Sequence, residues 1–181
     1  MSKILIETID LKKTYKHFDG DITLFNNLNL KIKQGDLVAL VGPSGSGKSS
    51  LLHLLALLDD PTRGDIKLNN IVTRKFTEEK KDEIRRKNIS IIFQDNNLLN
   101  DFTAIENVMM PLIIRGENLT NAEKEAKKIL KVVKIFDRSQ HFPNELSGGE
   151  QQRVAIARAL IAKTNLILAD EPTGNLDFKT A

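Results

Sequence analysis

A short glycine-rich segment at residues 42–50 constrains the fold of this chain more than any other feature. It reads Gly-Pro-Ser-Gly-Ser-Gly-Lys-Ser-Ser and fits the phosphate-binding pattern G-x-x-x-x-G-K-[ST] at every fixed position. An apolar run of strand length precedes it at residues 37–41, and a leucine-rich run of helix length follows at residues 50–58. A chance match arises in roughly one chain of this size in 200, and the surrounding pattern lowers that figure further. The segment therefore predicts a strand, a phosphate loop and a helix of an α/β protein.

The residues of this loop suit the binding of a nucleoside triphosphate. Gly45 and Gly47 allow a tight turn in which successive amide groups converge on a phosphate, and the following helix adds its positive end. Lys48 would reach the β- and γ-phosphates, and the Ser49 hydroxyl would complete the coordination of a bridging Mg²⁺. The predicted nucleotide-binding residues are Gly42, Pro43, Ser44, Gly45, Ser46, Gly47, Lys48, Ser49 and Ser50.

Composition limits the classes of protein that can carry this loop. The 181 residues, 40% apolar and 28% charged, suit one soluble domain with a sizeable core. The absence of cysteine excludes disulfides and thiolate metal sites and fits a reducing compartment. No apolar run resembles a secretion signal or has the ~20 residues that cross a bilayer, so we expect a cytosolic chain. The net charge of +3 is spread over mixed-sign segments, which does not predict nucleic acid as a partner.

The N-terminal part of the chain alternates apolar and polar residues. Residues 4–11 and 28–32 follow this pattern and predict two antiparallel strands. Tyr15, the only tyrosine, stands between them. An aromatic ring ahead of a phosphate loop can stack on a nucleotide base, although a lone tyrosine is more often a half-buried strand residue.

The middle of the chain changes between strand and helix patterns. Residues 65–70 predict an exposed strand, residues 77–87 a charged helix with a solvated face, and residues 88–93 a β-branched strand. This last strand ends in Gln94. A polar residue at a strand tip either points into a site or simply marks the exit of the strand, and the local sequence does not decide between the two.

Helical patterns follow this strand. Two capping boxes predict helices that begin at Thr103 and Thr120. Between them lies a strongly apolar run, residues 108–114, in which Pro111 is expected to break or kink a helix. Such a run is usually core, and a docking surface is the alternative.

Two further motifs near the end of the sequence indicate chemistry. Gly148 and Gly149 open an alanine-rich helix, and backbone amides at a helix start can bind an anion. The apolar strand of residues 165–169 ends in Asp170 and Glu171. A strand-tip aspartate beside a phosphate loop can hold Mg²⁺ through water, and an adjacent glutamate can act as a general base on water. A solvated acidic turn does not explain why the run is apolar up to this point.

In this order the motifs resemble the nucleotide-binding domain of ATP-binding-cassette (ABC) proteins over nearly the whole chain. The most specific stretch is residues 146–153, Leu-Ser-Gly-Gly-Glu-Gln-Gln-Arg, about fifteen residues before a strand that ends in Asp-Glu-Pro-Thr. The commonest form of the family has glutamine in place of Glu150, and we expect little effect from this departure. The resemblance implies an α/β P-loop NTPase fold with a RecA-like parallel sheet core, an N-terminal antiparallel β region and a helical signature subdomain. It implies one domain over residues 1–181, with the catalytic core and β region at 1–93 and 163–181 and the glutamine loop and helical subdomain at 94–162.

The resemblance assigns catalytic roles to matching residues. Tyr15 corresponds to the aromatic residue that stacks on adenine. Glu171 corresponds to the catalytic base, and Gln94 to the glutamine that senses Mg²⁺ and the attacking water. The implied cofactors are ATP and Mg²⁺, with Ser49, Gln94 and, through water, Asp170 as the metal site.

The resemblance also implies a dimer. Ser147, Gly148 and Gly149 would bind the γ-phosphate of an ATP held by a second ATPase subunit, so that two ATP molecules lie sandwiched in a head-to-tail dimer. Asp177 matches the loop that crosses this interface in the family. ATP binding would favour the closed dimer, and hydrolysis would release it.

Within the family, three stretches look most like the ATPase subunit of bacterial lipoprotein-releasing systems and their macrolide-exporter relatives: residues 51–55, 93–112 and 169–177. This likeness implies integral membrane permease subunits that dock near Gln94 to Ile114, and a peripheral position on the cytoplasmic face of a bacterial inner membrane. ATP hydrolysis would then drive the release of lipoproteins from that membrane. The alternatives are the ATPase of a macrolide-type exporter and a nucleotide-binding remnant without catalysis.

A soluble family member that acts on nucleic acid or ribosomes is disfavoured. Only 53 residues separate Gln94 from Ser147, which leaves no room for the long coiled coil of chromosome and repair ATPases. Ribosome-acting members carry two cassettes, and here there is one. No nucleic-acid partner is expected.

The match with the family ends shortly after Glu171. The family places a histidine that contacts the γ-phosphate some tens of residues further on, and residues 172–181 contain no histidine. The strand that the family inserts between the phosphate-loop strand and the Asp170 strand is also absent. We therefore expect a domain that is incomplete at its C-terminal end, whose exposed strand edges and apolar face lower its stability and favour association.

Overall fold

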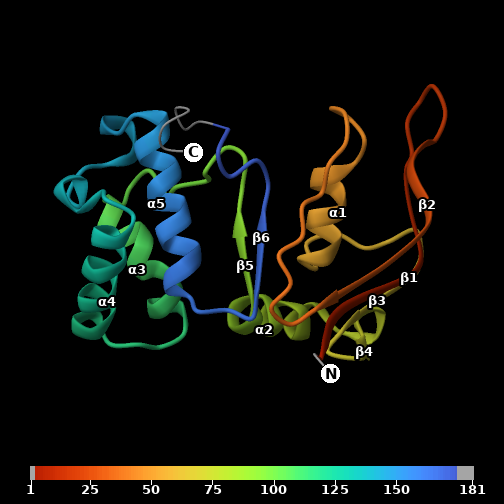
Figure 1. Cartoon of the computed structure of the whole chain (residues 1–181), viewed down its shortest axis with the longest axis horizontal. Coiled ribbons are helices and arrows are strands. Elements are labelled where there is room, and N and C mark those ends of the chain that lie inside the picture. The colour runs from red at the N-terminus through yellow and green to blue at the C-terminus, as the bar shows by residue number, and fades with distance from the viewer. Residues whose placement is uncertain (1–2, 175–181) are drawn as a thin grey trace. The chain divides into compact units, whose positions relative to one another are not determined.

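The structure, a computed structural model, describes residues 3–174 of the 181-residue chain. The chain forms two compact units, Met1–Glu83 and Ile84–Ala181, and each has its own arrangement of strands and helices (Figure 1). The boundary between the units falls inside helix α2, Glu78–Asn88. The domain boundaries implied by the family resemblance remain a prediction.

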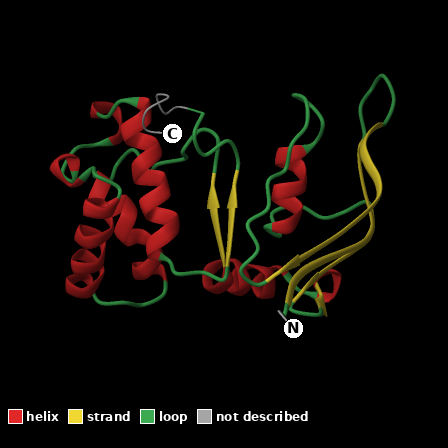
Figure 2. Ribbon diagram, viewed as in Figure 1, coloured by secondary structure: helices red, strands yellow, loops and turns green. Residues whose placement is uncertain are grey.

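An antiparallel sheet forms the body of the first unit (Figure 2). Its order is β2-β1-β3-β4, and its strands are β1 (Ile4–Tyr15), β2 (Ile22–Lys33), β3 (Arg63–Leu68) and β4 (Ile71–Val72). The long strands β1 and β2 pair from Ile4 opposite Lys33 to Tyr15 opposite Ile22. The N-terminal antiparallel β region is therefore confirmed, and it extends past the alternating runs of the sequence.

Helix α1, Lys48–Leu55, follows the phosphate loop. It begins and ends a little earlier than the predicted range of 50–58. Its buried side chains are Leu51, Leu54 and Leu55, one face of a helix. After the helix the chain returns to the sheet, where the Thr62 amide donates to the Lys12 carbonyl oxygen at 2.9 Å.

The predicted strand at residues 37–41 is wrong. The segment has no regular secondary structure, and none of its backbone groups is hydrogen-bonded to the backbone of another described residue. Leu37 and Val41 are 101% and 86% exposed. A strand is stable only beside a hydrogen-bonded neighbour, because its N–H and C=O groups point sideways out of the chain. The segment therefore exposes apolar side chains instead of pairing as a strand.

The second unit contains a two-stranded parallel sheet. Strands β5 (Ile89–Ile92) and β6 (Leu166–Ala169) lie side by side, from Ile89 opposite Leu166 to Ile92 opposite Ala169 (Figure 1). Parallel strands need a long crossover connection, which usually contains helix. Helices α3 (Ala104–Ile114), α4 (Leu119–Val132) and α5 (Gly148–Ile161) provide it here.

The three crossover helices pack around a shared core. Its fully buried members are Ala104, Val108, Ala122, Ala126, Leu130, Val154 and Ala157. Alanine is frequent among them and lets the helices approach closely. Pro111 lies inside α3 and does not break it, so of the two predicted effects the break is wrong and the kink remains a prediction. Short 3₁₀ turns occur at Thr73–Lys75 in the first unit and at Phe136–Arg138 and Pro143–Glu145 in the second.

One predicted helix cap is confirmed and the other is wrong. Thr103 Oγ1 accepts the Glu106 amide at 3.4 Å, and the Glu106 carboxylate accepts the Thr103 amide at 2.8 Å, as a capping box requires. Helix α4 is capped instead by Asn118, whose side-chain oxygen accepts the Asn121 amide at 2.8 Å. Asparagine is at least as good a cap as threonine, and here it places Thr120 inside the first turn of the helix.

Candidate functional site

The phosphate loop has the backbone of an anion site. Gly45 and Gly47 have φ angles of 78° and 90°, a left-handed conformation that residues other than glycine seldom adopt. Helix α1 begins directly after Gly47. The amides of Gly45, Gly47, Lys48 and Ser49 donate no backbone hydrogen bond within the described part of the chain. They are therefore available to phosphate oxygens, which fits a bound triphosphate.

The Lys48 ammonium group lies across this loop. Its Nζ donates to the carbonyl oxygens of Gly42 and Pro43, each at 2.9 Å. An ammonium group has three donors, so one remains for a phosphate oxygen. The loop thus holds a positive charge among free amide groups, as the predicted nucleotide site requires.

Tyr15, at the end of β1, is fixed by residues that the sequence analysis did not select. Tyr15 is 40% exposed, and its hydroxyl donates to Asp59 Oδ2 at 3.0 Å. The Lys13 ammonium lies 4.6 Å from the ring centre and 2.7 Å from the Asp59 carboxylate. Burial alone would raise the pKa of Asp59, but hydrogen bonds from Lys13, Tyr15 and the Asp60 amide hold this pKa below its ordinary value. Asp59 and Lys13 thus hold the ring in one orientation, which suits a stacking residue.

A buried lysine links the turn after α1 to helix α2. Lys81 is 7% exposed, and it donates to Glu78 at 2.8 Å and to Asp60 at 2.9 Å. The hydrogen bonds to Glu78 and Asp60 raise the pKa of Lys81. The prediction of a solvated face for this charged helix is therefore wrong at Lys81. Its partner Asp60 lies 21 residues earlier in the chain, beyond the reach of a local pattern.

Gln94 and Glu171 meet at the carboxyl end of the parallel strands. The Asp170 amide donates to the Ile92 carbonyl oxygen at 2.9 Å, just beyond the last paired residues of β5 and β6. Gln94 Nε2 then donates to Glu171 Oε2 at 3.2 Å, although 77 residues separate them. Both side chains are exposed and can be reached by water. The interpretation of Gln94 as a simple strand exit does not explain this hydrogen bond.

Glu171 has an unusual backbone conformation. Its φ angle is 47°, and holding a residue other than glycine in this region costs about 1–3 kcal/mol. The Gly174 amide donates to the Glu171 carbonyl oxygen at 3.0 Å and closes a turn around it. Strain of this kind is commonest at functional sites, and here it coincides with the hydrogen bond to Gln94.

Within the stretch 146–153, Ser147 and Glu150 form a capping box at the start of helix α5, which was not predicted from the sequence. Glu150 Oε2 accepts the Ser147 amide and the Ser147 hydroxyl, each at 2.8 Å, and Ser147 Oγ accepts the Glu150 amide at 3.4 Å. Gly148 and Gly149 are the first residues of the helix. The signal was available, because Ser-x-x-Glu before a helix is a capping box. Asp177 lies outside the described residues.

Arg158 connects helix α5 to the loop that follows Gln94. Its guanidinium group donates to the carbonyl oxygens of Asn96 at 2.7 Å and Asn97 at 2.8 Å. Both asparagines have positive φ angles, 59° and 50°, so the loop depends on such support. Burial lowers the pKa of Arg158, yet a guanidinium stays charged in proteins. No local pattern marks Arg158, because arginine is an ordinary helix former.

Asn107, fully buried in α3, fastens the next part of the same loop. Its Oδ1 accepts the Leu99 amide at 2.8 Å. Its Nδ2 donates to the carbonyl oxygens of Leu99, Phe102 and Thr103 at 3.0, 2.9 and 3.1 Å. A polar residue inside the apolar helix 104–114 was the available signal.

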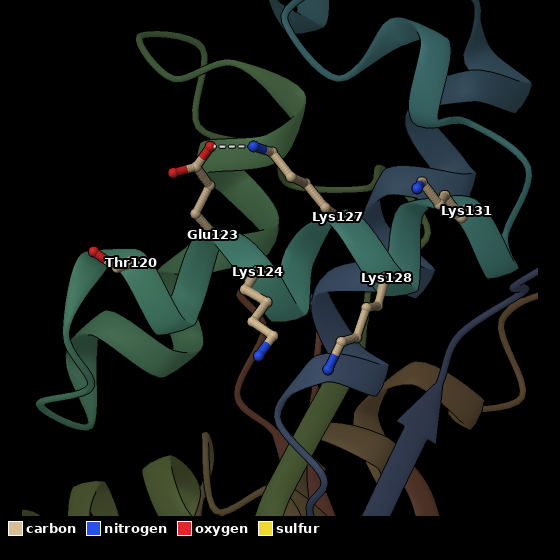
Figure 3. A pocket seen from close by; sticks show the side chains of 6 residues that line it. All are labelled: Thr120, Glu123, Lys124, Lys127, Lys128 and Lys131. Carbon is tan, nitrogen blue, oxygen red and sulfur yellow. Dashed lines mark ion pairs between the residues drawn. The ribbon is translucent and has the colours of Figure 1, made fainter.

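Figure 3 shows a hollow on helix α4. Six side chains line it: Thr120, Glu123, Lys124, Lys127, Lys128 and Lys131. Glu123 pairs with Lys127 at 2.6 Å, and Lys128 pairs with Glu125 at 2.5 Å. None of the six is a predicted site residue. The hollow is the basic, solvated side of a helix whose other side is buried in the core.

Residues 3–174 contain neither a preformed metal cluster nor a membrane span. No group of three His, Cys, Asp or Glu side chains there could hold a metal ion, and no helix there is long and apolar enough to cross a membrane. The predicted Mg²⁺ residues Ser49, Gln94 and Asp170 supply a hydroxyl, an amide and a carboxylate. Such a set relies on nucleotide phosphates and water to complete an octahedral shell, as is usual for Mg²⁺.

Known proteins share this sequence and this fold. Residues 25–174 match the ABC transporter family. The chain is 46% identical to the lipoprotein-releasing system ATP-binding protein LolD of Koribacter versatilis, over 94% of this chain and 77% of that protein. The LolD protein of Bordetella pertussis is 44% identical, over 94% and 74%. Two solved dimeric structures of the ATP-binding cassette MJ0796 have the same fold, each with a TM-score of 0.93. The one in a post-hydrolysis state bound to ADP and Pi is 42% identical to this chain, and the other is 43% identical. Each match covers 97% of this chain and 78% of the solved one. The chain therefore belongs to the ABC transporter family and is an ATP-binding, ATP-hydrolysing cassette subunit.

Proposed function

We propose that this ABC subunit powers the release of lipoproteins from an inner membrane toward an outer membrane. The hydrogen bond between Gln94 and Glu171 carries the enzymatic part of the proposal, because it joins a carboxylate that can act as general base to an amide that can orient water. Identity of 44–46% with two LolD proteins supports the choice of cargo. A macrolide-type exporter is the alternative.

In this proposal the phosphate loop of the first unit holds the triphosphate. Bound ATP supplies the phosphoanhydride bond that is cleaved, and Mg²⁺ neutralises charge on the β- and γ-phosphates. The free amides of the loop donate to the phosphate oxygens, and Lys48 adds a point charge. Ser49, Gln94 and, through water, Asp170 are the proposed metal residues. Tyr15 stacks on the adenine.

Hydrolysis depends on the pair Glu171 and Gln94 in the second unit. Glu171 takes a proton from the attacking water as general base. Gln94 already donates its Nε2 hydrogen to Glu171, which leaves its amide oxygen to accept a hydrogen from the same water. The pair can therefore fix the water in one orientation while its proton moves to the carboxylate.

The proposed active form is a head-to-tail dimer. Ser147, Gly148 and Gly149 of one subunit bind the γ-phosphate of the ATP that the other subunit holds, and Asp177 lies in the loop that crosses the interface. The amides of Gly148 and Gly149 at the start of α5 donate no backbone hydrogen bond within residues 3–174, which suits this contact. The dimeric solved structures of MJ0796 support this arrangement.

The proposed permease contact lies at residues 94–114. Leu99, Phe102 and Ile114 are 42%, 37% and 56% exposed there, and Asn107 fixes the backbone of Leu99 and Phe102. Exposed apolar side chains on a well-held loop suit a partner helix. The chain would then be peripheral, held by its permease at the cytoplasmic face of a bacterial inner membrane.

Reconstitution of the chain in vesicles with the permease of its own organism tests this function. The proposal predicts ATP-dependent release of an acylated lipoprotein, and no release with Glu171→Gln. Glu123→Gln, on the basic side of α4, is the control and should keep full activity. Export of a macrolide without lipoprotein release would assign the chain to the exporter class. ATP binding without turnover would identify a non-catalytic nucleotide-binding subunit.

A further inference from the structure

Both carboxylate oxygens of Glu150 accept hydrogen bonds. Oε2 accepts the amide and the hydroxyl of Ser147, each at 2.8 Å, and Oε1 accepts Arg138 Nε at 3.2 Å. Hydrogen bonds from the Ser147 amide and hydroxyl lower the pKa of Glu150, so the group is ionised at neutral pH. An ionised carboxylate can only accept hydrogen bonds.

This geometry fixes the hydrogen of the Ser147 hydroxyl. A serine hydroxyl has one hydrogen, and here it is donated to Glu150 Oε2. The Glu150 amide approaches a lone pair of the same serine oxygen at 3.4 Å. A phosphate oxygen is also an acceptor, so Ser147 cannot donate to the carboxylate and to a phosphate at the same time.

The charges around Glu150 also disfavour a phosphate at this helix start. Arg138 is its ion-pair partner, and Arg138 Nη1 also lies 3.3 Å from His141 Nε2. A triphosphate at this helix start brings several negative charges close to Glu150, and Arg138 offsets one charge at most. The carboxylate therefore opposes the anion that the amides of Gly148 and Gly149 would attract.

We propose that Glu150 is a positioning residue that turns the Ser147 hydroxyl away from phosphate and so limits the ATP-driven association of two subunits. The inference rests on the proposed function, in which Ser147 binds the γ-phosphate of an ATP held by a second copy of this chain. A glutamine at this position would offer an NH₂ group, which can donate to the serine oxygen and leave the serine hydrogen free for phosphate. From the sequence alone we expect little effect at Glu150, whereas its hydrogen bonds point to a clear one.

The test measures the dissociation constant of the ATP-bound dimer by sedimentation velocity. Every variant carries Glu171→Gln, so that ATP hydrolysis does not dissociate the dimer. Adding Glu150→Gln exchanges a charge-assisted hydrogen bond for a neutral one at two symmetric sites, which predicts roughly tenfold tighter association. The affinity of the monomer for ATP should not change. Glu145→Gln, which alters a different capping carboxylate that accepts the Phe142 amide at 2.7 Å, is the matched control.

A purely structural role for Glu150 predicts a different result. Loss of a capping carboxylate would lower both the thermal stability and the dimer affinity, whereas the proposal predicts a higher dimer affinity even where stability falls. Arg138→Gln removes the counter-charge and keeps the carboxylate, so it should weaken association. Equal or weaker dimerisation of Glu150→Gln relative to its parent would overturn the inference.

Ser147→Ala separates the failure of this inference from the failure of the proposed function. If Ser147 binds the phosphate of the second subunit, Ser147→Ala weakens the ATP-driven dimer. A parent chain that forms no dimer with ATP, or a dimer insensitive to Ser147→Ala, contradicts the proposed function and the inference with it. A dimer that weakens with Ser147→Ala and does not respond to Glu150→Gln contradicts the inference alone.

Discussion

Replacement of Asn107 by leucine tests how the loop at residues 99–102, part of the proposed permease contact, is held against helix α3. Asn107 is fully buried, and its side chain satisfies the amide and the carbonyl group of Leu99 and the carbonyl group of Phe102. Leucine has nearly the same shape and volume but makes no hydrogen bond. Asn107→Leu would therefore leave the Leu99 amide and the Phe102 carbonyl group without their partner, with no large cavity to complicate the result. The Leu99 carbonyl oxygen would keep the hydrogen bond from the Phe102 amide at 3.2 Å.

The expected cost follows from the number of groups left unpaired. A buried polar group without a partner costs about 1–3 kcal/mol. Leu99 is 42% exposed, so part of the loop can regain hydrogen bonds from water. We therefore expect a loss of about 2–4 kcal/mol in the free energy of unfolding, in the lower part of the range for two buried groups.

Urea unfolding followed by circular dichroism measures this loss. Asn100→Leu, an exposed position in the same loop, is the control and should change the free energy of unfolding by less than about 0.5 kcal/mol. Exchange of the Leu99 amide hydrogen should also become faster in Asn107→Leu. A loss no larger than that of the control, or an unchanged exchange rate, would refute the reasoning that Asn107 secures this loop.

Three further replacements test the nucleotide site and its supports. Lys48→Ala should weaken ATP binding at least about tenfold in equilibrium titration, because the charge inside the loop is lost; an unchanged affinity would contradict the role of the loop. Arg158→Lys keeps the charge but cannot hold two carbonyl groups in a fork, so ATP turnover should fall while ATP affinity stays constant, and equal turnover would argue against support of the Gln94 loop. The pKa of Asp59 is lowered from its ordinary 3.8 on folding, so its charge stabilises the fold above that pH, and this contribution is lost as the pH falls through the lower folded pKa. The stability difference between the parent and Asp59→Asn should therefore shrink in acid, and a constant difference would show that the carboxylate charge does not matter.

Local sequence patterns predicted the elements that depend on neighbours along the chain. Alternation at residues 4–11 and 28–32 predicted β1 and β2, and the box at Thr103 predicted the start of α3. The segment 37–41 differs, since its residues suit a strand but a strand forms only where another chain segment offers its backbone groups. Asn118 was missed because the cap is whichever residue takes non-helical φ and ψ angles, and both candidates have suitable side chains.

In the candidate site, too, local motifs were predictable from the sequence and contacts between distant residues were not. The phosphate loop was identifiable because its residues have short, fixed spacings. The contact of Gln94 with Glu171 depends on the parallel register of β5 and β6 across 77 residues, and only the family resemblance pointed to it. Arg158 reaches Asn96 across 62 residues, and no local pattern marks such a pair, because each member alone suits an ordinary surface position.

Replacement of Glu171 tests the central claim most directly. Steady-state ATP turnover and equilibrium ATP binding are measured for the chain and for Glu171→Gln, with Glu123→Gln as the control. Because the base is removed and the phosphate ligands remain, we predict that turnover falls at least about 100-fold while the ATP dissociation constant stays within about twofold. Turnover by Glu171→Gln equal to that of the parent chain would contradict the account.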